Sequence, residues 1–186
     1  MTRPSNAEPP GDAIETVVTY LEMTAPPDRA PARAPRPGLE IRHVSPCPVA
    51  IYRFLYGAVG GPWTWTERRL LSDADLDNIL ADPRVEVHVL SADGAPAGYV
   101  ELDRRCRPDI EIAYFGLLPG FIGQGLGRYL LDWAVTRAFE AAPARLWLHT
   151  CDLDHPRALA VYEAAGFRPY RTRRERVAAP PGTIRP

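Results

Sequence analysis

Three glycines at alternate positions, Gly123, Gly125 and Gly127, form the part of the sequence best suited to chemistry. They follow a β-branched and aromatic run at 110–117 and precede a pattern typical of a helix. Glycines at such a junction let backbone N–H groups approach a bound group with no Cβ atom in the way. The N-terminus of the following helix adds unsatisfied donors and a partial positive charge. The segment therefore predicts an anion site, most naturally for a phosphate or pyrophosphate.

Two familiar phosphate-binding loops fit this segment poorly. Gly120 and Gly125 have the spacing of a Walker A loop, but the lysine that such a loop requires is missing, since all 22 basic residues are arginine. A dinucleotide-binding G-x-G-x-x-G loop starting at Gly123 would need its third glycine where Arg128 stands. If the loop started at Gly125, its third position would be Leu130. The Walker A loop is excluded, whereas a nucleotide-dependent oxidoreductase stays an alternative.

The segment 110–167 resembles the GNAT superfamily of acyl-CoA-dependent N-acyltransferases. In that family the pattern Gln/Arg-x-x-Gly-x-Gly/Ala follows a strand and binds the coenzyme A pyrophosphate through backbone amides. Gly125 and Gly127 match the two small positions, whereas Ile122 stands at the Gln/Arg position. Because the loop binds mostly through N–H groups, the resemblance still implies a pyrophosphate site here.

Two further elements of the resemblance lie downstream. The family ends with an asparagine, a helix bearing a tyrosine, and a Gly-Phe pair. Ala158, Tyr162 and the Gly-Phe pair at 166–167 match this spacing, and His155 replaces the asparagine. Together with the glycine loop, these elements imply a GNAT fold of the α+β class, in which helices flank a mixed central sheet. That sheet would combine an antiparallel meander with a strand-helix-strand unit.

The resemblance also implies acetyl-CoA as the co-substrate, with no metal, and an oxyanion donor among the backbone N–H groups near residues 115–117. The coenzyme contacts carried over from the family are Phe115, Gly116, Leu117, Ile122, Gly123, Gln124, Gly125, Leu126, Gly127, Arg128 and His155. From the residues themselves, the three cysteines are widely spaced and form no Cys/His cluster that would suggest a metal site.

Acyl transfer from a thioester to an amine needs a base more than an acid. Holding an amine of pKa ~10.4 neutral at about pH 7.4 costs about 4 kcal/mol, whereas a thiol of pKa ~8.5 needs about 1–2 kcal/mol of help to leave. Glu111, eleven residues before Ile122, is the candidate base. A similarly spaced strand glutamate is the general base in the histone-acetylating branch of the family. Glu101 is the reserve, and Glu111 could instead be a solvent-facing strand residue.

Four other features have two interpretations each. Tyr162 resembles the family's general acid toward the thiolate, or it packs as an aromatic residue of an amphipathic helix. His149 could touch the acceptor or relay protons, or simply be hydrogen-bonded. The aromatic loop 63–65 could line an apolar or cationic acceptor site, or plug the core below it. The arginine-rich run 168–176 is typical of a solvated strand face, with the coenzyme 3′-phosphate or an acidic acceptor as alternative contacts.

Length and composition narrow the classes of function. A chain of 186 residues, 46% of them hydrophobic, suits one domain with a substantial core. Its formal net charge of −1 does not favour nucleic acid or membrane partners, and no signal peptide or membrane-length apolar run is visible. We therefore expect a cytoplasmic enzyme that acetylates a primary amine of a small molecule or peptide. A non-catalytic acyl-CoA-binding module on the same fold is the second alternative.

An α+β arrangement must position these residues. We expect a disordered, Pro- and Arg-rich segment at 1–37 with a strand at 15–23, an acetyltransferase domain at 38–178, and a flexible tail at 179–186. Further strands are predicted at 39–43, 85–92, 97–103, 110–117, 145–150 and 167–177, and helices at 49–59, 72–80, 125–141 and 156–165. The early strand would join its own sheet or, in a homodimer, the sheet of a second copy.

Overall fold

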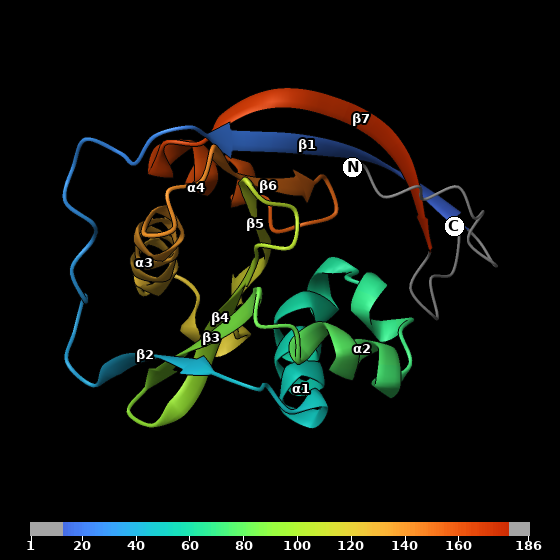
Figure 1. The fold of residues 1–186 in the computed structure, drawn as a ribbon, viewed down its shortest axis with the longest axis horizontal. Coiled ribbons are helices and arrows are strands. Elements are labelled where there is room, and N and C mark those ends of the chain that lie inside the picture. The colour runs from blue at the N-terminus through green and yellow to red at the C-terminus, as the bar shows by residue number, and fades with distance from the viewer. Residues whose placement is uncertain (1–12, 179–186) are drawn as a thin grey trace.

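Within residues 13–178, the part of the chain that the computed structural model describes, one seven-stranded sheet has the order β2-β3-β4-β5-β6-β1-β7 (Figure 1). The strands are β1 (Ala13–Met23), β2 (Leu39–Val44), β3 (Val85–Ala92), β4 (Ala95–Asp103), β5 (Asp109–Leu117), β6 (Arg145–Cys151) and β7 (Arg168–Ala178). The helices are α1 (Val49–Gly60), α2 (Asp73–Leu80), α3 (Leu126–Phe139) and α4 (Ala158–Ala165). The segments predicted to be disordered at 1–12 and flexible at 179–186 lie outside the described residues.

The sheet is mixed, as predicted. Neighbouring strands run antiparallel except for β5 and β6, which are parallel and joined through α3. The α+β class with flanking helices is therefore confirmed. Two predicted helices are shorter than expected: α3 covers 126–139 in place of 125–141, and α4 begins at Ala158, two residues after Pro156. The N–H groups of Arg157 and Ala158 instead bind Nδ1 and the carbonyl oxygen of His155, at 3.1 and 2.7 Å, in a separate turn.

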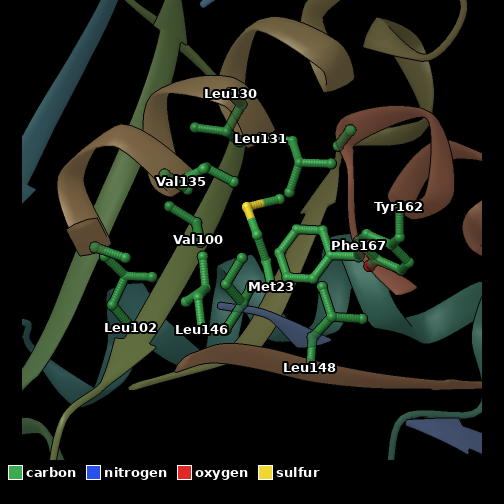
Figure 2. Packing of buried hydrophobic residues seen from close by; sticks show 14 of the residues in the cluster. Met23, Val100, Leu102, Leu130, Leu131, Val135, Leu146, Leu148, Tyr162 and Phe167 are labelled. Atoms are coloured by element: carbon green, nitrogen blue, oxygen red, sulfur yellow. The ribbon is translucent and has the colours of Figure 1, made fainter. Parts of the chain in front are cut away.

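The strand predicted at 15–23 is present as β1, and it lies inside the sheet of its own chain. It runs antiparallel to both β6 and β7, with Tyr20 opposite His149. Because side chains alternate along a strand, Leu21 and Met23 enter the core while Tyr20 faces the other side of the sheet. Figure 2 shows the Met23 side chain in the middle of that core. The strand is therefore part of the same folded body as the segment from residue 38 onward.

An extended linker, residues 24–38, joins β1 to β2 and runs past α3 (Figure 1). Its anchor is the buried carboxylate of Asp132, which accepts hydrogen bonds from Arg29 at 2.7 and 2.8 Å and from the N–H of Ala32 at 2.8 Å. Further along, the linker passes the start of α3, where a Cβ placed on Gly125 would lie 3.7 Å from Pro35. The ion pair thus sets the path by which the chain leaves β1 and reaches β2.

Two hydrophobic clusters pack against the sheet. The larger lies beneath α3 and α4 and includes Leu130, Leu146 and Phe167 (Figure 2). The smaller packs α1 and α2 against β3 and β4 and includes Tyr52 and Tyr99. The buried residues of α3 recur every three or four positions, which gives the helix one apolar face toward the sheet. These clusters hold β4, β5 and α3 firmly, so the loop between β5 and α3 is anchored at both ends.

Candidate active site

The strands β5 and β6 diverge, and the gap between them defines the candidate site. They pair only over residues 109–111 and 145–147. Beyond Glu111, β5 remains paired with β4 on its other side as far as Leu117. The β6-facing edge of residues 112–117 therefore carries backbone groups that no described strand pairs. An extended ligand could satisfy these groups by hydrogen bonding.

Two backbone N–H groups of β5 point toward this gap. The N–H of Leu118 binds the carbonyl oxygen of Ala97 in β4 at 2.9 Å. Since successive N–H groups of a strand point to opposite sides, the amide of Gly116 also faces β4, and those of Phe115 and Leu117 face the gap. Two of the three amides expected to serve as oxyanion donors thus have a suitable direction.

The glycine loop lies at the end of β5 and leads into α3. Gly123 and Gly125 have φ values of 84° and 77°, a region that residues with a Cβ rarely adopt. Nothing lies within 4 Å of a Cβ placed on Gly123, and Gly125 directly precedes the first turn of α3. Open space beside the free N–H groups of a helix N-terminus fits an anion such as a pyrophosphate.

Other residues expected at the coenzyme contribute little through their side chains. Leu126 is fully buried, so only its backbone could face a ligand. Gln124 donates its amide to the carbonyl oxygen of Gly120 at 2.9 Å, which holds the loop together. The guanidinium of Arg128 pairs with Asp132 at 2.9 Å and is 39% exposed. Any anion binding here therefore depends mainly on backbone groups.

Three further positions shape the space around the loop. A Cβ on Gly116 would lie 2.4 Å from the side chain of Val59, so α1 can approach β5 this closely only at a glycine. A Cβ on Gly127 would lie 3.7 Å from Leu117, an ordinary contact. The side chain at position 122 is apolar and exposed, because Ile122 offers 43% of its surface to solvent. It brings no polar group to the site.

Glu111, the candidate base, lies where β5 and β6 part. Its Oε1 is 3.7 Å from Nδ1 of His149, and the two side chains are 24% and 38% exposed. Burial alone would lower the pKa of His149, but the Glu111 carboxylate and the charges of Glu67 and Asp154 together raise it. A partly exposed carboxylate beside an imidazole is well placed to accept a proton from a group in the gap.

Glu101, the reserve base, is enclosed in the core. Its side chain is fully buried, accepts a hydrogen bond from the Tyr52 hydroxyl, and pairs with Arg68 at 2.5 Å. Burial raises the pKa of Glu101, an effect that the Arg68 guanidinium opposes. Because both carboxylate oxygens already have partners inside the core, the geometry favours Glu111 over Glu101 as the base.

Tyr162 extends from α4 to the edge of the larger core. It is 9% exposed and packs edge-on against Phe115 and Phe167, with ring centroids 6.0 and 6.3 Å away. Burial raises the pKa of Tyr162, which keeps its hydroxyl protonated. The ring contact with Phe115 brings Tyr162 against a residue of β5's open edge, so a packing role and a donor role are compatible.

The aromatic loop 63–65 connects the two early helices with the turn between β6 and α4. Trp65 packs against the smaller core cluster and donates its indole N–H to Asp154 at 3.0 Å. Trp63 packs edge-on against His155, with centroids 5.0 Å apart. The loop therefore covers part of the core and also reaches the end of β6. His155, expected at the coenzyme, lies against this loop.

Sequence reasoning missed two side chains beside His149. Tyr20 of β1 and Trp147 of β6 flank the imidazole, with ring centroids 5.7 and 6.3 Å from it. The alternation within β1 predicts that Tyr20 and Leu21 face opposite sides, but nothing local identifies β6 as the neighbouring strand. The arginines of the 168–176 run lie on β7, an edge strand, and are exposed.

Two sequence expectations concern metal-binding groups and membrane-spanning helices. Residues 13–178 contain no group of three or more His, Cys, Asp or Glu side chains that could hold a metal ion. None of the helices in the described part of the chain is long and apolar enough to cross a membrane.

Known proteins share this sequence pattern and fold. The model of the Acetyltransferase (GNAT) family matches residues 50–167, more than half of the chain. Proteins of Mycobacterium bovis and Mycobacterium tuberculosis, both named as uncharacterized N-acetyltransferases, are 32% identical to this chain over 109 residues. That alignment covers 59% of this chain and 69% of each relative.

Solved structures agree in fold. A GCN5-related N-acetyltransferase from Kribbella flavida matches with a TM-score of 0.59 and 19% identity over 87% of this chain. An aminoglycoside acetyltransferase from an uncultured soil metagenomic sample matches with a TM-score of 0.57 and 13% identity, over 69% of this chain and 88% of that one. This chain spans 57% of the Kribbella protein and 60% of a functionally unknown Staphylococcus epidermidis protein of the same fold. The family match and the mycobacterial relatives show that this chain belongs to the GNAT family of acetyltransferases.

Proposed function

We propose that this protein transfers an acetyl group from acetyl-CoA to a primary amine of a small molecule or peptide, by direct attack in a ternary complex. The observation that carries the proposal is the parting of β5 and β6 at Glu111. Between that point and the end of β5, the chain combines a carboxylate beside an imidazole, an open strand edge, and two amides directed into the gap. These are the groups that acyl transfer to an amine requires.

The coenzyme would be held mainly by the backbone. The open edge of residues 112–117 fits the extended arm of the coenzyme, and the glycine loop with the N-terminus of α3 fits its pyrophosphate. When bound, acetyl-CoA supplies an acyl group whose carbon bonds to an amine nitrogen as its bond to sulfur breaks. The N–H group of either Phe115 or Leu117 would stabilise negative charge on the acyl oxygen. The other would bind the coenzyme arm, since amides two residues apart on a strand lie about 7 Å from each other.

Two side chains would carry out the proton transfers of the reaction. Glu111 takes a proton from the amine as the nitrogen attacks, and His149 lies 3.7 Å from its carboxylate. The Tyr162 hydroxyl, protonated at neutral pH, gives its proton to the departing thiolate and regains one from water. The products are an amide and a free thiol. One proton is released to water overall when the acceptor arrives as an ammonium ion.

A broad panel of primary amines with acetyl-CoA tests the proposal by following free thiol and the mass of the product. We expect thiol release that depends on the amine, together with a product heavier by one acetyl group. Tight coenzyme binding with no turnover on any amine would favour a non-catalytic acyl-CoA-binding module instead. A melting temperature raised by NAD(P) but not by acetyl-CoA would support the oxidoreductase alternative.

A further inference from the structure

Four rings form a cluster on the sheet face opposite α3, which we call the aromatic platform: Tyr20, Trp147, His149 and Tyr170. Tyr20 lies at its centre, with ring centroids 6.3 Å from Trp147, 5.7 Å from His149 and 6.3 Å from Tyr170. The Trp147 ring is inclined by 26° to Tyr20 and by 29° to His149. Three strands that are distant in sequence, β1, β6 and β7, thus place these rings side by side.

The aromatic platform is partly open to solvent although its rings pack together. Tyr170 is 41% exposed, and Tyr20 and Trp147 are half-buried. The Tyr20 ring is held in place because its hydroxyl donates to Glu175 at 2.9 Å. Flat apolar faces that are fixed and still reachable can stack on a planar ligand without an ordering cost.

The charges differ between the two ends of the aromatic platform. At the His149 end, Glu111 is 3.7 Å away, and Glu67 and Asp154 are near enough for their charges to act on the imidazole. This end attracts a cation such as a protonated amine.

Two arginines lie at the opposite end. The guanidinium of Arg145 lies 5.3 Å from the ring centre of Tyr170, and that of Arg171 lies 5.9 Å from the ring centre of Tyr20. Arg145 is ion-paired with two carboxylates at 3.0 and 2.8 Å, so repulsion of a second cationic group on a ligand would come from Arg171. A single amine on an uncharged, flat body therefore suits the charge pattern better than a polyamine does.

We infer that the aromatic platform binds the body of the acceptor, and that the acceptor is a primary amine carried by an aromatic ring. The inference rests on the proposed acetyl transfer. The amine lies at the acidic end, where Glu111 takes its proton, while the ring stacks on Tyr20 and Trp147. Tyr20 belongs to β1, outside the family-matched residues 50–167, so acceptor selection depends on the N-terminal strand.

The test compares 2-phenylethylamine with 2-cyclohexylethylamine, which has a similar size and amine pKa but no flat ring. We expect kcat/KM to favour the phenyl compound by roughly 3- to 10-fold, the range that aromatic pairing supports. Tyr20→Leu should bring the ratio close to one, and Tyr20→Phe should preserve it because the ring remains. The ratio is insensitive to partial unfolding, since both amines are measured with the same protein sample.

Three outcomes would overturn the inference. Equal kcat/KM for the two amines in the unaltered protein would overturn the inference even if Tyr20→Leu failed to fold. An unchanged ratio in a folded Tyr20→Leu protein, with acetyl-CoA still raising its melting temperature, would also remove it. Faster turnover of a linear polyamine than of either compound would contradict the charge argument. In each case the proposed acetyl transfer would stand, whereas thiol release with no amine at all would remove both.

Discussion

Replacing Glu111 by glutamine should slow acetyl transfer strongly and leave coenzyme binding nearly unchanged. Glutamine has almost the same shape, but its amide cannot take a proton from the acceptor. Because Glu111 lies at the start of the gap and the glycine loop lies beyond the far end of β5, the coenzyme contacts should survive. We expect kcat/KM for the amine to fall by roughly 10²- to 10⁴-fold, the usual contribution of a positioned base.

The size of this effect follows from the protonation state of the acceptor. An amine of pKa ~10.4 is about three units above neutral pH, which corresponds to about 4 kcal/mol or roughly a thousandfold in rate. As the assay pH approaches about 10, the amine loses its proton without help, and the difference between variant and unaltered protein should shrink. A pH profile of kcat/KM therefore separates loss of a base from general damage.

The same substitution should alter stability in a pH-dependent way. The Glu111 carboxylate raises the pKa of His149 against the opposing effect of burial. For a histidine of raised pKa, the stabilisation is fully present below the unfolded value of about 6.5 and is lost as the pH rises through the folded value. Thermal melting should therefore show Glu111→Gln to be more destabilising at about pH 5.5 than at about pH 9.

The matched control is Glu163→Gln, which changes an exposed carboxylate of α4. It should leave both the rate and the melting temperature close to their original values. Unchanged turnover of Glu111→Gln at neutral pH would refute the assignment. So would a rate deficit of constant size up to about pH 10, because it could not then come from amine protonation.

Other substitutions test the coenzyme site, the acid and the linker. Gly125→Val, at φ 77°, should abolish the acetyl-CoA-induced rise in melting temperature. Gly120→Ala, with open space around its Cβ, should retain that rise. Retained binding in both variants would exclude the loop as the coenzyme site. Tyr162→Phe should lower turnover roughly 10- to 100-fold with coenzyme affinity kept, and an unchanged rate would leave Tyr162 a packing residue only. Asp132→Asn should cost about 1.5–3 kcal/mol in denaturant unfolding, since it weakens the hydrogen bonds that Arg29 and the Ala32 N–H make to a buried carboxylate. Asp93→Asn, at an exposed pair, should cost less than about 1 kcal/mol. Similar losses from both would contradict the role of Asp132 as anchor.

Most elements of the fold follow from local patterns. Ser72, the first residue of the helix predicted at 72–80, accepts a hydrogen bond from the N–H of Asp75 and so caps α2. The β-branched run of β5 and the glycines after it predict a strand, a loop and a helix start, and all three are present. Such signals are readable because they depend on residues a few positions apart. The start of α4 was less predictable than its end, since the turn at His155 uses hydrogen bonds that helix periodicity does not reveal.

The candidate site was only partly predictable. Glu111 and the glycine loop stand out because their spacing along one strand and loop is local. The sequence alone could not separate Glu111 from Glu101. Only packing shows that Glu101 is enclosed with Arg68 while Glu111 remains reachable.

The sequence by itself determined the types and order of the elements, the position of the glycine loop before a helix, and the family resemblance. Only the tertiary structure decided that β1 lies between β6 and β7, and that Tyr20 therefore stands beside His149. The physical reason is that strand pairing joins residues more than a hundred positions apart. Alternation within a strand says which side chains share a face, but the choice of neighbour depends on packing and on the linker path set at Asp132.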